Sequence, residues 1–247
     1  MTVHVLLADP PRDGLVLPEL PDTSPLTESE ATELYEAMVK DACVAAATSG
    51  GRLLVNYPPA EDIPAAHETG RPPEADLRRV VADALEDPDD ARFEVQVGSS
   101  YDARVGNTVT HLLRDEDESS VAVVDPRAPL LARKDLDSAA MKLRRRDAVL
   151  GPSQRGRVHY AGFTQPIDFA GAYTTPELDT LTARARDAGG DVDFLSQQPL
   201  VQTGTDLETL VPILDARRRA GRIVPTHTTQ HLAELGIHLT DDGLQRA

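Results

Sequence analysis

Apolar residues recur along this chain in two alternating patterns, which predict strands and helices in turn. The short apolar runs Val3–Ala8, Arg52–Tyr57 and Ser119–Val124 are typical of strands, and the first is typical of one buried in a parallel sheet. Between the first two, Glu28–Thr48 carries apolar residues every three or four positions, which predicts a helix. Because strands and helices alternate throughout, we expect an α/β protein with a central, mostly parallel sheet.

The remaining elements follow the same alternation. Thr27 and Glu30 form an expected capping box at the start of the long helix. Residues 58–73 are polar and rich in proline, which predicts a long surface loop rather than a linker between domains. The other predicted helices cover 74–85, 101–113, 136–146, 175–188, 207–220 and 228–235, and the other predicted strands cover 93–98, the two sides of the turn Gly151–Gly156, and 192–195. We expect one domain over residues 1–247, with a peripheral C-terminal segment at about 222–247.

The net charge of the chain argues against one class of binding partner. Asp and Glu number 41 against 25 Lys and Arg, a formal net charge of −16, which argues against nucleic-acid binding because that needs a basic face. The acidic residues are scattered along the chain, and lysine occurs only at positions 40, 134 and 142. Concentrated salt screens such a surface. The composition therefore favours an extreme halophile over an ordinary acidic protein.

Further features of the sequence bear on the location of the protein and on its cysteine chemistry. No apolar run reaches the roughly 18 residues of a membrane span, and Val3–Ala8 is too short for a signal peptide. We therefore expect a cytoplasmic protein that does not bind membranes. Cys43 is the single cysteine, so no internal disulfide or multi-cysteine zinc site forms, and its helical setting predicts a buried side chain. The sequence carries no signal for an oligomeric state.

Asp125 and the turn Gly151–Gly156 are the candidate site, because both follow predicted strands and ligands gather at the carboxyl ends of parallel strands. An aspartate there holds Mg²⁺ or Mn²⁺ in some proteins, while the Asp125-Pro126 pair equally suits a simple turn. His227 and His231 have the spacing of two metal ligands on one helix, but a solvated helix face is favoured. No common catalytic motif is present, and the catalytic residues are unknown.

Four segments in sequence order carry a family resemblance. They are Leu26–Cys43, a first helix; Val121–Leu131, a strand and Asp–x–Pro-like turn; Asp147–Phe163, a glycine-turn segment; and Leu195–Leu210, the counterpart of a DVDT–DL motif. Together they resemble the small single-domain GT-A-like nucleotide-diphospho-sugar transferases, which include glycosyltransferases of the arsenosugar-biosynthesis type. More distantly they resemble nucleotidyltransferases such as the phospholactate guanylyltransferases.

The resemblance implies a three-layer α/β/α GT-A-like fold and a ligand that is a nucleotide or nucleotide-sugar. It places a divalent metal, Mg²⁺ or Mn²⁺, at Asp125. The positions that it assigns to nucleotide binding are Arg12, Gly14, Gly151, Pro152, Arg155, Gly156 and Arg157.

The chain also departs from the family pattern. Leu17, Pro18 and Glu19 stand where the family has Lys-Thr-Arg, and Leu200–Thr203 replaces DVDT, so that only Asp206 remains of the acidic motif. Each lost charge-assisted contact is worth about 1.5–3 kcal/mol. Arg155 and Arg157 would compensate if they faced the phosphates. Two hypotheses follow: a metal-dependent glycosyl- or nucleotidyltransferase, or a catalytically degenerate member of the family with a binding or regulatory role.

Overall fold

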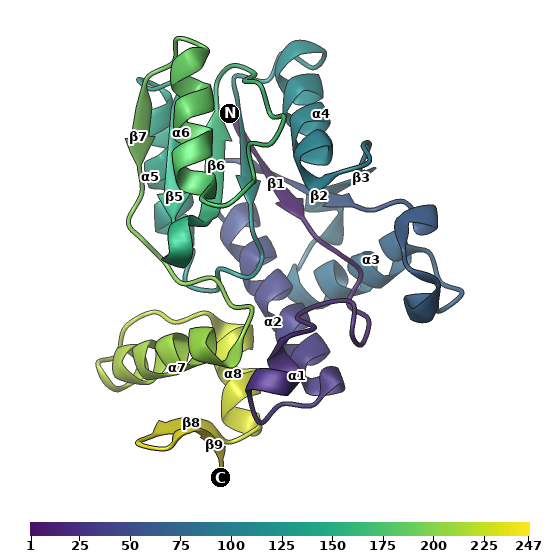
Figure 1. The fold of residues 1–247 in the computed structure, drawn as a ribbon, viewed down its shortest axis with the longest axis vertical. Coiled ribbons are helices and arrows are strands. Elements are labelled where there is room, and N and C mark those ends of the chain that lie inside the picture. Colours follow the sequence, from purple (N-terminus) through teal and green to yellow (C-terminus); the bar gives the residue numbers. More distant parts are fainter.

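A seven-stranded sheet forms the centre of the protein, which a computed structural model describes over residues 1–247 (Figure 1). Its strand order is β3-β2-β1-β4-β6-β5-β7, and β6 alone runs antiparallel to its neighbours. A separate two-stranded hairpin, β8–β9, lies near the C-terminus. The strands are β1 (Thr2–Leu7), β2 (Arg52–Tyr57), β3 (Ala91–Val95), β4 (Ser120–Val124), β5 (Ala148–Pro152), β6 (Val158–Phe163), β7 (Val192–Phe194), β8 (Ile237–Thr240) and β9 (Gly243–Arg246).

Helices cover both faces of this sheet. Successive side chains of a strand point to opposite faces, and in β4 Ala122 and Val124 join one apolar cluster while Val121 and Val123 join the other. The first cluster takes in α2 (Glu28–Ala47), α3 (Pro73–Ala84) and α5 (Arg133–Leu143), and the second takes in α4 (Tyr101–Arg114) and α6 (Glu177–Asp187). The predicted three-layer α/β/α architecture with a mostly parallel sheet is confirmed.

Helix α2 extends beyond the sheet and contacts helices from both ends of the chain. Its capping box forms as predicted, since Thr27 accepts the N–H of Glu30 and Glu30 accepts that of Thr27. The lower part of Figure 1 shows α1 (Leu20–Thr23), α7 (Gly204–Arg219) and α8 (Thr226–Glu234). Their buried leucines join the first apolar cluster, which we call the α2 cluster. Asp41 of α2 accepts the backbone N–H groups of His227 and Thr228 at 3.0 and 2.8 Å, which caps α8.

The C-terminal elements therefore share a continuous apolar cluster with the sheet. Leu232 of α8 and Ile237 of β8 are buried within it. The single domain over residues 1–247 with a peripheral segment from about 222 stays a prediction. None of the helices combines the length and the apolar character that crossing a bilayer requires.

Gly204, the first residue of α7, lies against α1 at a distance that leaves no room for a side chain. A Cβ there would stand 1.8 Å from the backbone oxygen of Thr23, and the Gly204 N–H donates to the Thr23 hydroxyl at 2.9 Å. We expect Gly204→Ala to lower the free energy of unfolding by about 1–3 kcal/mol, because the two backbones must separate. Urea unfolding measures this. Gly50→Ala is the control, because Gly50 also lies outside the left-handed region and a Cβ there would stand 3.7 Å from its nearest neighbour, which is an ordinary contact.

Several elements differ from the sequence prediction in their bounds. β3 begins two residues earlier than expected, and α5 begins at Arg133 because Asp135 accepts the backbone N–H of Ala132 and so starts the helix. The proline-rich loop contains two short 3₁₀ turns, η1 (Ala60–Asp62) and η2 (Ala65–His67). The hairpin β8–β9 was not predicted.

His4 is a polar side chain in the middle of the buried strand β1. It is 1% exposed, and its Nδ1 atom has no hydrogen-bond partner. The ring packs against Gly51, where a Cβ would stand 2.5 Å away from it. Burial lowers the pKa of His4 to about 4, although the nearby Asp137 charge acts to raise it.

Candidate functional site

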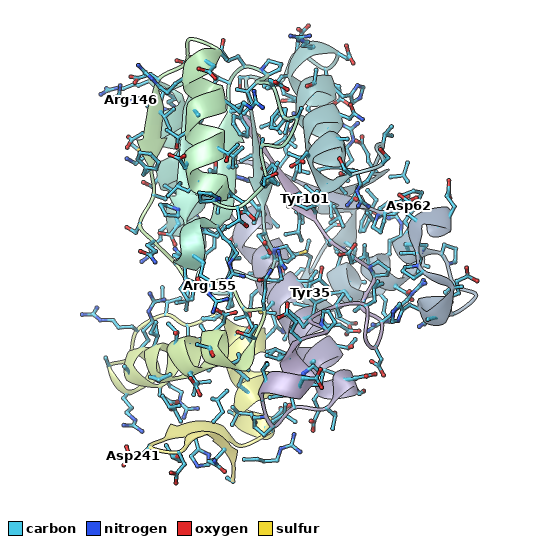
Figure 2. The ribbon with its side chains drawn as sticks, in the orientation of Figure 1. Tyr35, Asp62, Tyr101, Arg146, Arg155 and Asp241 are labelled. Atoms are coloured by element: carbon cyan, nitrogen blue, oxygen red, sulfur yellow. The ribbon has the colours of Figure 1, made fainter.

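Two hollows meet at the carboxyl ends of β1 and β4. One has a volume of about 280 Å³ and the other about 240 Å³, and both are lined by Tyr101, Asp125 and Arg127. The larger is also lined by Arg157 and Glu177 among others. We call the two together the β1–β4 cleft. Figure 2 labels Tyr101 and Tyr35, another cleft residue, near the middle of the molecule. The cleft lies at the strand ends where a parallel sheet is expected to place its ligand.

Asp125 is held by a residue two positions further along the same turn. Its Oδ1 accepts the backbone N–H and the Nε–H of Arg127, both at 2.9 Å, and its Oδ2 accepts Nη2–H at 2.6 Å. Burial acts to lower the pKa of Arg127, but the charge and hydrogen bonds of Asp125 outweigh this and raise that pKa. The Asp125–Arg127 pair is therefore a bidentate ion pair within one turn.

A second carboxylate, Asp9, follows β1 and lines the smaller hollow. Its backbone N–H donates to the hydroxyl of Tyr35 at 3.1 Å. Loss of hydration between the cleft walls raises the pKa of the Asp9 carboxyl, the Asp125 charge raises it further, and Arg104 and Arg127 lower it. Burial likewise places the pKa of Tyr35 well above its ordinary value. Asp9 therefore holds a proton more readily than a solvated aspartate.

Glu177, at the start of α6, is a third carboxylate in the cleft. It accepts the backbone N–H of Val158 at 3.0 Å. Burial raises the pKa of Glu177, and the Asp125 charge adds to this, while that hydrogen bond and the charges of Arg127 and Arg157 lower it. Across the same hollow, the rings of Tyr101 and Tyr173 meet edge to face with centroids 5.0 Å apart.

Arg157 is the predicted nucleotide-binding residue that the structure brings to Asp125. Its Nη1–H donates to the side chain of Gln202, and its Nη2 lies 3.5 Å from the carboxylate of Asp206. Asp206 in turn accepts the N–H groups of Gln202 and Thr203 at 2.9 and 3.0 Å, so this aspartate caps α7. Arg157 is thus positioned by the first turn of α7 and lines the larger hollow.

Arg12, by contrast, does not face the cleft. Its Nε donates to Asp76 at 3.0 Å, and Nη1 and Nη2 donate to the backbone oxygens of His67 and Arg71. The guanidinium is 6% exposed and ties the first loop to α3. Gly14 in the same loop has a φ of +72° and packs against the His67 ring. These two positions support the loop, and their role in nucleotide binding stays a prediction.

The other predicted positions of the glycine turn determine its backbone conformation. Gly151 lies against the His159 ring, where a Cβ would stand 2.5 Å away, and a bulge follows between Gly151 and Pro152. Arg155 and Gly156 both adopt a left-handed backbone, with φ of 59° and 70°. The Arg155 side chain is exposed and does not line either hollow (Figure 2). Of the two arginines proposed to compensate for the lost basic residues, only Arg157 reaches the cleft.

The residues around Asp125 do not fit a divalent metal as they stand. Both carboxylate oxygens accept from Arg127, so a guanidinium occupies the side on which a cation would bind. No group of three His, Cys, Asp or Glu side chains converges anywhere in the structure in a way that could hold a metal ion. The assignment of Mg²⁺ or Mn²⁺ to Asp125 remains a prediction.

Sequence reasoning missed Asp9, Tyr35, Tyr101, Arg127 and Glu177 of the cleft, among others. Two had a signal: Asp9 directly follows the end of the first strand, as Asp125 follows a later one, and Arg127 is two residues from Asp125. The other three, on helices, had none, because only the fold brings them to the cleft: Tyr35, Tyr101 and Glu177.

Comparison with known proteins supports the fold assignment. No protein-family model matches the chain, and no curated protein matches it in sequence. Among solved structures, a protein from Desulfovibrio desulfuricans described as a nucleotide-diphospho-sugar transferase is similar over 94% of each chain, with 19% identity and a TM-score of 0.73.

More distant similarity extends to two nucleotide-handling enzymes, each with a TM-score of 0.50. A CMP:2-keto-3-deoxy-manno-octonic acid synthetase in complex with CTP covers 87% of this chain and 99% of its own, at 10% identity. A 4-diphosphocytidyl-2C-methyl-D-erythritol synthase from Anaerococcus prevotii covers 87% and 96%, at 11% identity. The chain therefore has a GT-A-like fold of the kind found in nucleotide-diphospho-sugar transferases and nucleotidyltransferases.

Proposed function

We propose that this protein is a glycosyl- or nucleotidyltransferase that binds a nucleotide or nucleotide-sugar in the β1–β4 cleft. The observation that carries the proposal is that two guanidinium groups, Arg127 and Arg157, line one hollow at the carboxyl ends of the strands. Guanidinium groups bind phosphate oxygens through parallel N–H bonds. The tyrosine ring of Tyr101 lines both parts of the cleft and offers a flat apolar surface to a base or sugar.

The chemistry needs only groups that the cleft contains. An acceptor hydroxyl oxygen forms a bond to the transferred sugar carbon or phosphorus, and the bond from that atom to the departing phosphate oxygen breaks. The departing phosphate gains negative charge, which Arg127 and Arg157 stabilise. The hydroxyl proton passes to a carboxylate, and Glu177 suits this role because it lines the same hollow and its pKa is raised.

A second candidate function is a binding or regulatory protein that has lost catalysis. It is favoured by one observation: the first loop offers no free cation to a ligand, since the guanidinium of Arg12 is engaged with Asp76 and two backbone oxygens. The two functions differ in turnover, which only the transferase shows.

Binding is the first measurement. Calorimetric titration with nucleotides and nucleotide-sugars in concentrated KCl should detect saturable binding, and Arg157→Ala should weaken it by about 10–100-fold, the value of one charge-assisted contact. Arg144→Ala, which removes an exposed arginine at the end of α5, is the matched control and should leave binding unchanged.

Arg155→Ala in the same titration tests whether the exposed arginine of the turn contributes. Absence of binding by every ligand, from a protein with an intact circular dichroism spectrum, would contradict the proposal. Release of free nucleotide or pyrophosphate over time then separates the transferase from the binding protein.

A further inference from the structure

The turn Asp125-Pro126-Arg127 follows β4 and places the guanidinium of Arg127 directly against the carboxylate of Asp125. Proline fixes its own φ near −65°, and the Asp125 carboxylate accepts the backbone N–H of Arg127, which closes a tight turn. This turn returns the Arg127 side chain to the same carboxylate, where Nε and Nη2 complete a fork at 2.9 and 2.6 Å. The pair forms between residues two apart, so bringing the two groups together costs little chain entropy.

The fork leaves donors for a ligand. A guanidinium has five N–H groups, and two of those on Arg127 bind Asp125, while no protein atom accepts from Nη1. Arg127 lines both hollows of the cleft, and its side chain is 33% exposed. Asp125 therefore fixes one edge of the Arg127 guanidinium, and the remaining N–H groups are free to bind a ligand in the cleft.

Displacing this arginine by a metal would be costly. Asp125 is 11% exposed, and the three donors of Arg127 satisfy it. A metal that took the carboxylate would have to expel the guanidinium, and it would then have no third His, Cys, Asp or Glu ligand from the protein. Breaking such a partly buried pair leaves an uncompensated charge.

We propose that the Arg127 guanidinium takes the place of a divalent cation on Asp125, so that the β1–β4 cleft binds the phosphate groups of its ligand without a metal. The inference rests on the proposed function and names how that site holds its anion. Arg127 and Arg157, each paired with an aspartate, together supply guanidinium N–H donors to the anion, and Asp125 acts as a positioning residue that orients Arg127.

The test measures binding of ADP, GDP, CDP, UDP and inorganic pyrophosphate by calorimetry, in excess EDTA and in excess Mn²⁺. The proposal expects the dissociation constant of a binding ligand to agree within about threefold between the two conditions, and Arg127→Gln to weaken binding by about tenfold or more in EDTA. Arg133→Gln, an exposed arginine on α5 paired with Asp137, is the matched control and should bind as the wild type does.

Two further measurements keep the test decisive. Arg127→Lys retains the charge without the fork, so it should fold and still bind more weakly than the wild type. Electron paramagnetic resonance of Mn²⁺ added alone should show no bound metal in the wild type. Binding that appears only with Mn²⁺ and is lost in Asp125→Asn would overturn this inference and leave the proposed function standing. If none of these probes binds, both this inference and the proposed function are overturned.

Discussion

Replacing Arg12 with alanine is expected to lower the free energy of unfolding by about 3–5 kcal/mol, because it leaves the buried Asp76 with only the exposed Arg71 as an ion-pair partner. Asp76 is 2% exposed, and Arg12 both donates to it and satisfies the backbone oxygens of His67 and Arg71. The variant would lose the connection between the first loop and α3. Urea unfolding followed by circular dichroism, in concentrated KCl, measures the difference.

Two controls separate the ion pair from other effects. The double variant Arg12→Ala/Asp76→Ala removes both charges and should recover part of the lost stability. Arg71→Ala removes a partner of Asp76 that is 64% exposed, and should cost no more than about 1 kcal/mol. An Arg12→Ala protein that is as stable as the wild type but has lost nucleotide binding would instead place Arg12 in the ligand site.

Acidification is expected to remove about 3 kcal/mol of stability through His4 as the pH falls from about 6.5 to about 4. Burial lowers the pKa of His4 from 6.5 to about 4. In this interval the unfolded chain binds a proton at His4 and the folded chain does not, so stability rises with pH. The contribution is complete above about 6.5 and absent below about 4.

The measurement is a difference between two proteins, because other groups titrate in the same range. Burial raises the pKa of Glu177, so this carboxyl group acts in the opposite direction and favours folding as the pH falls. Unfolding free energies of the wild type and His4→Gln across this range isolate the histidine. If both proteins lose stability equally on acidification, His4 is charged in the folded state.

The architecture was predictable because its signals are local. A strand buried on both faces needs a continuous apolar run, as Val121–Val124 has, and a helix start needs a cap such as Thr27. The hairpin Ile237–Arg246 carries neither signal, because much of it is exposed and its two strands pair only with each other. Its existence depends on packing of Ile237 against the α2 cluster, which a linear pattern does not show.

The site was predictable only in part, because ligand contacts depend on residues that are distant in sequence. Asp125 could be located from its strand, and Arg157 from the turn beside it. The direction of the Arg12 side chain could not be predicted, since Arg12 lies in a loop and its partner Asp76 is 64 residues away, on α3. The halophilic origin rests on the acidic composition. The cytoplasmic location rests on the lack of a signal-peptide pattern and of a long apolar run. Both stay predictions.

The cap that Asp41 places on α8 makes completion of the fold depend on the order of synthesis. Asp41 emerges from the ribosome long before its partners, which lie 186 and 187 residues further along the chain. Until α8 follows, one side of α2 lacks its apolar cover, and the nascent protein carries an exposed patch that other chains can bind. Domains made of long-range contacts are exposed to aggregation for this reason.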